Sequence, residues 1–335
     1  MSDFYVKRTT PKPSEIYDTY WKFAAERQAI FYKRLLHPSS PPWTDDIILR
    51  AFKFTNAYRA ADRVSQFLIS QVIGDKEWSS KDMLYRILLF KLFNKIETWQ
   101  FLERRLGQLS WRNYRFKELA AALEEAKRVN GTMYSAAYIM ASGKQAFGYN
   151  RKHENHLRLL EKMLLDGLDQ SIASASSMEK VYNLLIAYPT IGSFLAYQLA
   201  TDINYSNLTN FTEMEFVKAG PGARDGISKC FTDIGGYSEE DVIKWMTDRQ
   251  EREFERLELH FDGLWGRHLQ LIDCQNIFCE VDKYSRVAHP HASGNSKRTR
   301  IKQQFGPTSL RPLKYKFPSE WNLMTINIPN QKSYE

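Results

Sequence analysis

The sequence predicts a mainly α-helical protein. Apolar and aromatic residues recur every three or four positions along most of the chain, as they do on one face of a helix. Few segments alternate polar and apolar residues in the manner of a half-buried strand. The sequence contains no internal repeat and no heptad pattern, so the helices are expected to pack into a globular body rather than a solenoid or coiled coil.

Helices are expected in order along the chain, separated by Pro, Gly and capping residues. The Pro-rich segment 37–42 ends the first helix, and Thr44-Asp45-Asp46 is typical of the N-cap region that precedes the second. Gly74 ends the second helix, and Ser79 begins the third. The expected helical segments are 14–36, 47–73, 79–106, 117–128, 153–172, 178–187 and two within 239–279.

The composition is that of a folded protein, and its net positive charge favours an anionic partner. Hydrophobic residues make up 43% and charged residues 26% of the 335 residues, which excludes disordered and collagen-like classes. Lys and Arg number 47 against 39 Asp and Glu, a net charge of +8 that makes nucleic acid the favoured partner. The N-terminus lacks the apolar core of a signal peptide, and no apolar run approaches the roughly 20 residues of a membrane helix. A cytoplasmic monomer that does not contact membranes is expected.

Cysteine and histidine spacing gives no sign of a metal or cofactor. The three cysteines form no Cys-x-x-Cys pair, which excludes a disulfide framework and a zinc ribbon. The scattered histidines have no convincing ligand spacing, and neither a metal nor a cofactor is expected; they include His153, His156, His289 and His291. Walker loops and dinucleotide fingerprints are also absent from the sequence.

Three consecutive segments are expected. They are an N-terminal helical subdomain over 1–150, a helix-hairpin-helix subdomain over 151–290 and a basic C-terminal arm over 291–335. The arm is rich in Ser, Lys, Arg and Pro, and its cations are candidates for contacts with DNA phosphates: Lys297, Arg298 and Arg300. A solvated surface tail is the alternative.

The segment LLIAYPTIGSFLAYQ predicts a helix-hairpin-helix. An apolar helix end meets the turn Tyr188-Pro189-Thr190-Ile191-Gly192, and a second helix begins at Ser193. Backbone N–H groups at such a helix start bind a DNA phosphate without reading sequence. The candidate backbone-binding residues are Tyr188, Thr190, Gly192 and Ser193; a turn that merely joins two helices is the alternative.

The glycine-rich segment Gly220-Pro221-Gly222-Ala223-Arg224 is a second candidate phosphate site. Glycines such as Gly220 and Gly222 let backbone N–H groups approach an anion, and Arg224 could add a bidentate contact. A tight turn that caps a helix is the alternative.

Three carboxylates are candidate catalytic groups. The hairpin resembles that of helix-hairpin-helix DNA glycosylases, which place an acidic residue about 20 positions after the last hairpin glycine; Glu213 and Glu215 lie there, although the glycosylases have a Val-Asp pair. Asp282 follows Val281 but comes about 90 residues after the hairpin. A structural ion pair with a neighbour such as Lys283 is the alternative.

A polar helical face is the candidate site for an extruded base. On a continuous helix its members lie three or four residues apart, and Asn, Gln and Arg can bind base edges or phosphates: Asn56, Arg59, Asp62, Arg63 and Gln66. A solvated face with ion pairs is the alternative. Trp99 is either a stacking platform for a base or a core residue.

Seven ordered segments together resemble one family over nearly the whole chain. They are YWKFAAERQAIFYKRL, PPWTDD, FKFTNAYRAADRVSQFLI, LLFKLFNKIETW, YPTIGSFLAYQLATDINYS, AGPGARDGISKCF and DCQNIFCEVDKYSRV. The chain is similar to the helical DNA-base hypermodification proteins, which include the α-glutamyl/putrescinyl thymine pyrophosphorylase-like proteins and the helical domain found with 5-hydroxymethyluracil DNA kinases. The resemblance implies a glycosylase-like helical fold that acts on 5-hydroxymethyl-derived pyrimidines in DNA.

The resemblance to this family implies one of two activities, base excision or group transfer to the base. Base excision is favoured because a hairpin followed by an acidic residue is typical of glycosylases. The chain would then flip a hypermodified pyrimidine out of DNA, plausibly phage DNA in antiphage defence, while Glu215, Glu213 or Asp282 stabilises the sugar cation. The polar face, Arg224 and Lys283 would hold the base. The alternatives are a transferase that replaces an activated group on 5-hydroxymethyluracil with an amino acid or polyamine, and a non-catalytic DNA-binding module.

Overall fold

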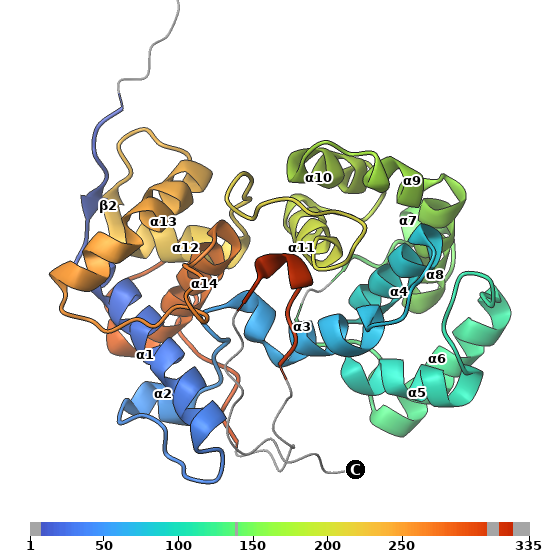
Figure 1. Ribbon diagram of the computed structural model, residues 1–335, viewed down its shortest axis with the longest axis horizontal. Coiled ribbons are helices and arrows are strands. Elements are labelled where there is room, and N and C mark those ends of the chain that lie inside the picture. The colour runs from blue at the N-terminus through green and yellow to red at the C-terminus, as the bar shows by residue number, and fades with distance from the viewer. Residues whose placement is uncertain (1–7, 138–139, 307–314, 324–335) are drawn as a thin grey trace, which may run out of the picture. The chain divides into compact units, whose positions relative to one another are not determined.

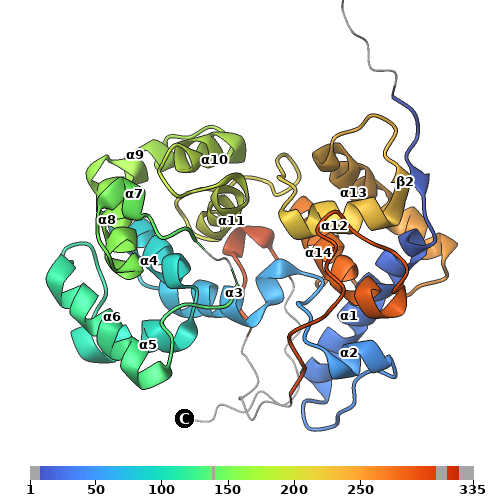
Figure 2. The same cartoon turned by 180° about the vertical axis from the view of Figure 1, so that it is seen from behind.

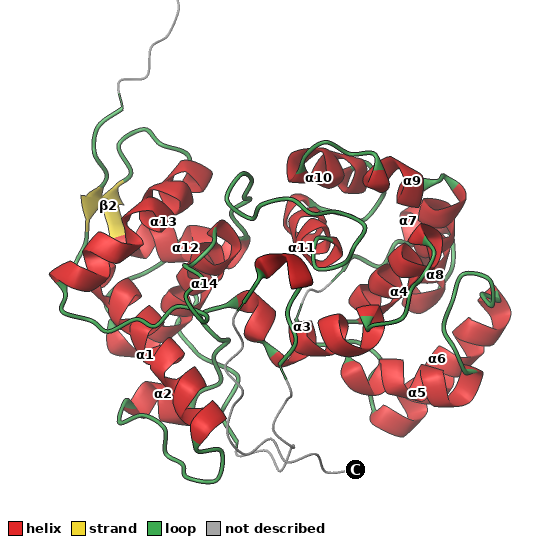
Figure 3. Cartoon of the chain, viewed as in Figure 1, coloured by secondary structure: helices red, strands yellow, loops and turns green. Residues whose placement is uncertain are grey.

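A computed structural model describes residues 8–137, 140–306 and 315–323, and within these residues the predicted α class is confirmed. Helices dominate the chain, as Figure 1 and Figure 3 show. The described strands are short: β1 (Lys12–Pro13) pairs antiparallel with β2 (Phe231–Asp233). In the described part of the chain, no helix combines the length and apolar character needed to cross a membrane.

The described chain divides into two compact units, not into three consecutive segments. Unit 1 contains residues 8–62, 213–306 and 322–323, and unit 2 contains residues 63–137, 140–212 and 315–321. The N-terminal helix belongs with the C-terminal third because α1 (Ile16–Leu36) packs against α12 (Pro221–Cys230) and α14 (Leu271–Ala288). Basic arm residues 297–306 also belong to unit 1.

Unit 1 has an aromatic core between α1, α13 (Glu239–Arg256) and α14. These three helices contact one another and can be followed in Figure 2. The ring of Tyr20 lies 4.6 Å from that of Phe278, and the ring of Trp21 lies 5.2 Å from that of Phe254. Both residues of α1 are completely buried, and the Tyr20 hydroxyl donates to the carbonyl oxygen of Cys274 at 3.1 Å. Packing of large rings and satisfaction of the Tyr20 hydroxyl fix α1 on α14.

Two glycines let α12 touch α14. A Cβ atom at Gly226 would lie 2.1 Å from the carbonyl oxygen of Phe278, and one at Gly222 would lie 3.0 Å from the sulfur of Cys279. Gly220 is the N-cap of α12, and Pro221 is its first residue. Gly222 and Gly226 are therefore required for close helix packing, while phosphate binding by this segment stays a prediction.

Unit 2 surrounds α4 (Ser80–Phe93), in which every residue from Met83 to Phe93 is buried. A helix that is buried on all sides is the centre of a helical unit. The other helices of unit 2 are α3 (Arg63–Phe67), the π-helix η2 (Leu68–Ile73), α5 (Ile96–Leu106), α6 (Phe116–Asn130), α7 (Lys144–Phe147), α8 (Lys152–Leu165), α9 (Leu168–Ala173), α10 (Met178–Ile186), α11 (Ser193–Ile203) and the 3-10 turn η3 (Ser319–Trp321).

The expected helix over 47–73 is broken in the middle, and this prediction was wrong. It consists of α2 (Ile47–Ala51), an irregular stretch, the 3-10 turn η1 (Arg59–Ala61), and then α3 and η2. Side chains replace the helical hydrogen bonds: Oδ1 of Asp62 accepts from the Asn56 backbone N–H at 2.8 Å, and the Asn56 amide donates to the carbonyl of Ala61 at 2.8 Å. Asn and Asp compete with helix formation in this way. The single polar face expected from 56 to 66 therefore does not exist.

Candidate functional site

The irregular stretch before η1 begins a cluster of polar residues in unit 1. Arg27 of α1 donates through Nη2 to Oδ1 of Asn56 at 3.0 Å and through Nε to the carbonyl of Thr55 at 2.9 Å. The Thr55 N–H donates to Oε2 of Glu280 at 3.0 Å. A backbone without regular structure is thus held in place by side chains from α1 and α14.

Arg59 joins this stretch to the start of α14. Its backbone N–H donates to Oδ1 of Asp273 at 2.8 Å, while the other oxygen of Asp273 accepts from the N–H of Gln270 at 3.0 Å. Arg59 and Asp273 are 214 positions apart in the chain, and both are almost completely buried. Asp273 therefore caps α14 and anchors η1 with the same carboxylate.

Glu213 is the first residue of the chain after it returns from unit 2 to unit 1. Its Oε2 lies 2.9 Å from Nη2 of Arg267, and the side chain is only 3% exposed. The carbonyl of Arg267 accepts from the hydroxyl of Tyr58 at 2.5 Å. Asp62 is the last residue of unit 1 before the chain leaves it. The chain thus first leaves unit 1 at Asp62 and first returns to it at Glu213. Both residues belong to a cluster that we call the carboxylate–arginine cluster: Arg27, Asn56, Arg59, Asp62, Glu213, Arg267, Asp273 and Glu280.

Burial raises the pKa of three carboxyl groups in this cluster: Asp62, Asp273 and Glu213. Loss of contact with water raises the pKa of Asp62 to about 7, against the opposing effect of the Asn56 N–H group and of Arg27 and Arg59. Burial likewise raises the pKa of Asp273 to about 7, and the nearby carboxylate of Glu213 adds to the rise. The pKa of Glu213 is also raised by burial, while Arg267 opposes this. Carboxylates that titrate near pH 7 are suited to accept and release protons.

The cluster extends to a more accessible rim. Asn56, Asp62 and Glu280 are partly buried. Lys283 lies 2.6 Å from Glu280, and its ammonium group lies 4.5 Å from the centre of the Phe54 ring. A cation, an amide and a carboxylate at the edge of a buried charge cluster can bind a polar ligand and exchange protons with it.

The structure places the other predicted carboxylates elsewhere. Glu215 is exposed, although it is only two residues from buried Glu213. Asp282 is buried between two cations: its Oδ1 lies 2.9 Å from Nζ of Lys229, and its Oδ2 lies 2.5 Å from Nη2 of Arg286. This arrangement supports the structural ion pair for Asp282.

Two residues of the expected polar face belong to unit 2, as does Trp99. Arg63 is exposed, and Gln66 is buried, where its amide exchanges two hydrogen bonds with the backbone of Lys316 at 2.9 and 2.8 Å. Trp99 is 2% exposed, with its ring 5.8 Å from that of Phe90. Trp99 therefore lies in the core of unit 2, one of the two roles that its sequence context predicted.

The hairpin joins α10 and α11, which pack against each other. The hydroxyl of Tyr182 donates to Oγ of Ser193 at 2.9 Å, and Gly192 is the N-cap of α11. Thr190 has a φ of +70°, a left-handed conformation that β-branched residues rarely adopt. Tyr188 lines a cleft of about 680 Å³ along α9 and α10, together with Lys180.

The cationic candidates for phosphate binding are exposed. Arg224 lies on the solvent side of α12, and the arm residues Lys297, Arg298 and Arg300 are all accessible. Asp225 anchors the start of the arm, because its Oδ1 accepts from the backbone N–H of Ser296 at 2.9 Å. Exposed cations on an anchored segment can reach a phosphate backbone.

Four members of the carboxylate–arginine cluster were not predicted from the sequence: Arg27, Arg267, Asp273 and Glu280. Asp273 and Glu280 belong to the segment DCQNIFCEVDKYSRV, one of those that resemble the family, so that segment was the available signal. Arg27 and Arg267 have no local signal. Their roles follow from packing between α1, the start of α14 and the irregular stretch.

Comparison with known proteins identifies the family. The 5-hmdU DNA kinase helical domain matches residues 14–294, most of the chain. The chain belongs to this family. A 5-hmdU DNA kinase of Bacillus phage SP10 is 28% identical to this chain over 298 residues, which are 83% of this chain and 46% of the relative. The chain thus spans about half the length of that curated relative. No solved structure matches the chain.

The family membership expected from the sequence is confirmed, but the activity favoured there was wrong. The phage relative is named as a kinase, an enzyme that transfers a phosphoryl group, whereas a glycosylase hydrolyses the N-glycosidic bond. The comparisons give no support to a relation with glycosylases, to base excision or to antiphage defence. Of the activities weighed, modification of the base agrees better with these findings.

Proposed function

We propose that this chain is part of a transferase that modifies 5-hydroxymethyluracil in DNA. The observation that supports it is the combination of family membership over residues 14–294 with a partly buried residue, Asp62, whose carboxyl pKa is raised to about 7. The name of the phage relative supplies the substrate and the reaction, phosphorylation of 5-hydroxymethyluracil in DNA.

In this reaction the oxygen of the 5-hydroxymethyl group attacks the phosphorus of a phosphoryl donor. A new oxygen–phosphorus bond forms, the bond from phosphorus to the leaving group breaks, and the hydroxyl proton must be accepted. Asp62 accepts this proton, since its carboxylate is deprotonated in a substantial fraction of molecules at pH 7. Lys283 at the rim stabilises the charge on the transferred group.

A second candidate is substitution at the 5-methylene carbon. The sequence contains no Walker loop for a nucleotide phosphoryl donor, and substitution does not need such a donor. For phosphorylation, a separate part of the enzyme would hold the donor, since the chain spans only 46% of the kinase relative. In the substitution an amine attacks the methylene carbon, a carbon–nitrogen bond forms, and the carbon–oxygen bond to an activating phosphate breaks. Asp62 then removes a proton from the amine.

DNA binding is assigned to three segments. The start of α11, the start of α12 and the arm would contact phosphates through Thr190 to Ser193, Arg224 and the arm cations. The unusual backbone conformation of Thr190 supports the hairpin, because strained conformations cluster at functional sites. Replacing Lys297, Arg298 and Arg300 with alanine should reduce the log–log slope of DNA affinity against salt by about 0.9 for each phosphate that these side chains neutralise.

The test uses duplex DNA that contains 5-hydroxymethyluracil at one position. The protein is incubated with this DNA and radiolabelled ATP or GTP, and separately with 5-phosphomethyluracil DNA and a mixture of amino acids and polyamines. Label transfer supports phosphorylation, and a gain in base mass in the second reaction supports substitution. The proposal is refuted if the DNA stays unmodified in both reactions and the protein binds 5-hydroxymethyluracil DNA no more tightly than thymine DNA.

A further inference from the structure

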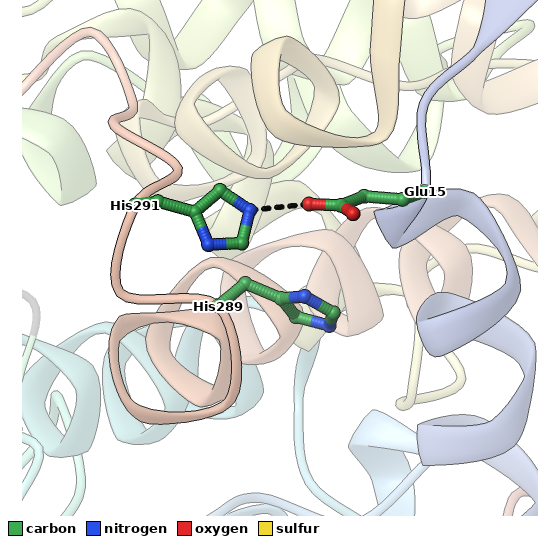
Figure 4. Close-up of side chains that lie close together, drawn as sticks. All are labelled: Glu15, His289 and His291. Carbon is green, nitrogen blue, oxygen red and sulfur yellow. Dashed lines mark hydrogen bonds and ion pairs between the residues drawn. The ribbon is translucent and has the colours of Figure 1, made fainter.

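Three potential metal ligands meet in unit 1, away from the carboxylate–arginine cluster (Figure 4). Glu15 is the N-cap of α1, His289 is the C-cap of α14, and His291 follows two residues later. One ligand atom from each residue lies within 4.8 Å of the others, and His291 and Glu15 already form a hydrogen-bonded ion pair. Residues 276 positions apart in the chain are thus brought together at two helix ends.

The backbone holds all three residues in place. The N–H of Ser14, next to Glu15, donates to the carbonyl of Cys230 at 2.9 Å. The N–H of His289 donates to the carbonyl of Ser285, and the N–H of Ala292 returns to the carbonyl of His289 at 2.9 Å. The second bond closes a turn from His289 to Ala292 with Pro290 at its second position, where the fixed φ of proline favours such a turn. The two imidazoles are therefore presented by a tight turn rather than by a loose loop.

A neighbouring hydroxyl group orients the imidazole ring of His289, as hydrogen-bonding partners of histidine ligands do in known metal sites. Oγ1 of Thr19 on α1 lies 2.9 Å from Nε2 of His289. When Nε2 donates to this oxygen, the lone pair of His289 available to a cation is that of Nδ1. Metal-bound histidines generally use their second ring nitrogen for such a hydrogen bond, which sets the tautomer and the ring orientation.

We propose that Glu15, His289 and His291 bind a divalent transition-metal ion, zinc being the favoured ion. Two imidazoles and one carboxylate are the ligand set of three-ligand zinc sites, in which a fourth position remains for water. The ligand set disfavours magnesium and calcium, which prefer oxygen ligands alone. Glu15 and His291 have side chains 61% and 65% exposed, so the ion can enter from solvent.

The bound ion would join the start of α1 to the end of α14. These helices already pack against each other, so the ion would add to an existing contact and need not create one. Binding to the folded state alone stabilises a protein in proportion to the logarithm of ion concentration over the dissociation constant. Metal binding at this site is independent of the proposed transferase activity, and the test does not use that activity.

The experiment titrates the metal-free protein with zinc and with cobalt. We expect one ion per chain, an absorption band of four- or five-coordinate cobalt in the visible range, and a rise in Tm with zinc but not with equimolar magnesium. His291→Ala and Glu15→Gln should each weaken zinc binding at least about tenfold, and Thr19→Val should weaken it by about 10- to 100-fold as a positioning residue.

The matched control is His260→Ala. His260 is exposed and lies 2.8 Å from Asp262, and no third His, Cys, Asp or Glu among the described residues joins this His–carboxylate pair as a ligand group. This variant should bind zinc like the unchanged protein. The proposal is overturned if zinc binds no better than magnesium, or if His291→Ala and Glu15→Gln retain the original affinity while circular dichroism shows both to be folded.

Discussion

Nζ of Lys229 lies 2.9 Å from Oδ1 of Asp282 and 3.1 Å from the carbonyl oxygen of the same residue. The two side chains are 1% and 2% exposed, and they connect α12 to α14. Arg286 completes the group from the next turn of α14. Each oxygen of this buried carboxylate is paired with a cation, which favours a structural role for Asp282.

Removal of one partner of this group should destabilise unit 1. Lys229→Ala leaves the carboxylate of Asp282 with Arg286 alone, and breaking a buried ion pair costs about 3 to 5 kcal/mol. Urea denaturation of Lys229→Ala and of the triple variant Lys229→Met/Asp282→Leu/Arg286→Met measures this. The triple variant should recover most of the stability, since it replaces all three charges with apolar groups; equal destabilisation of both variants would contradict the prediction.

Asp62→Asn should lower the rate of base modification by about 10²- to 10⁴-fold, the usual contribution of a general base. The activity of the unchanged protein should rise with pH and level off above about pH 7, because Asp62 accepts a proton only when its carboxylate is ionised. Glu215→Gln is the control, since Glu215 is exposed in the same unit. An Asp62→Asn enzyme with unchanged rate and pH profile would remove Asp62 from the reaction.

The raised pKa values of Asp62 and Asp273 should make stability decrease with pH between about 4 and 7. Both carboxyl groups hold their protons to about pH 7 when folded but lose them near pH 4 when unfolded, so the folded state binds more protons in this range. The effect is at most about 1.4 kcal/mol per pH unit for each group. Asp62→Asn and Asp273→Asn should each flatten this decline.

This effect must be measured as a difference between variants and the unchanged protein. Burial lowers the pKa of His156 to about 4, and a histidine that stays neutral when folded adds stability as pH rises over the same range. Urea midpoints at pH 4.5, 5.5, 6.5 and 7.5 give the two curves. Parallel curves for Asp62→Asn and the unchanged protein would show that the pKa of Asp62 is not raised.

Gly226→Ala should destabilise the contact between α12 and α14 by about 3 kcal/mol. The added Cβ would lie 2.1 Å from the carbonyl oxygen of Phe278, so the two helices must move apart. Gly306→Ala is the matched control, because Gly306 is exposed, no atom lies within 4 Å of its added Cβ and its φ lies outside the left-handed region. Thermal unfolding should place Gly306→Ala within about 0.5 kcal/mol of the unchanged protein. A similar small change for Gly226→Ala would refute this packing.

Local sequence signals predicted the helical class and many helix ends. Asp46 caps α2 by accepting from the N–H groups of Ile48 and Leu49, and Ser79 caps α4 by accepting from the N–H of Asp82. Gly74 ends η2 with a positive φ. These signals act within a few residues, so the order of amino acids is sufficient to reveal them. The resemblance to the helical domain family was likewise visible in ordered motifs and is confirmed.

Tertiary packing decided which of the candidate residues meet. Asn56 and Asp62 turned the expected helix into an irregular stretch, so that Arg59 contacts Asp273 rather than sharing a face with Gln66. Glu15 meets His291 across 276 positions. A sequence pattern reports which side chains share a face over a few turns, whereas contacts between distant segments depend on how apolar faces such as those of α1 and α14 pack. The composition of both polar clusters was therefore fixed by the fold, not by any local motif.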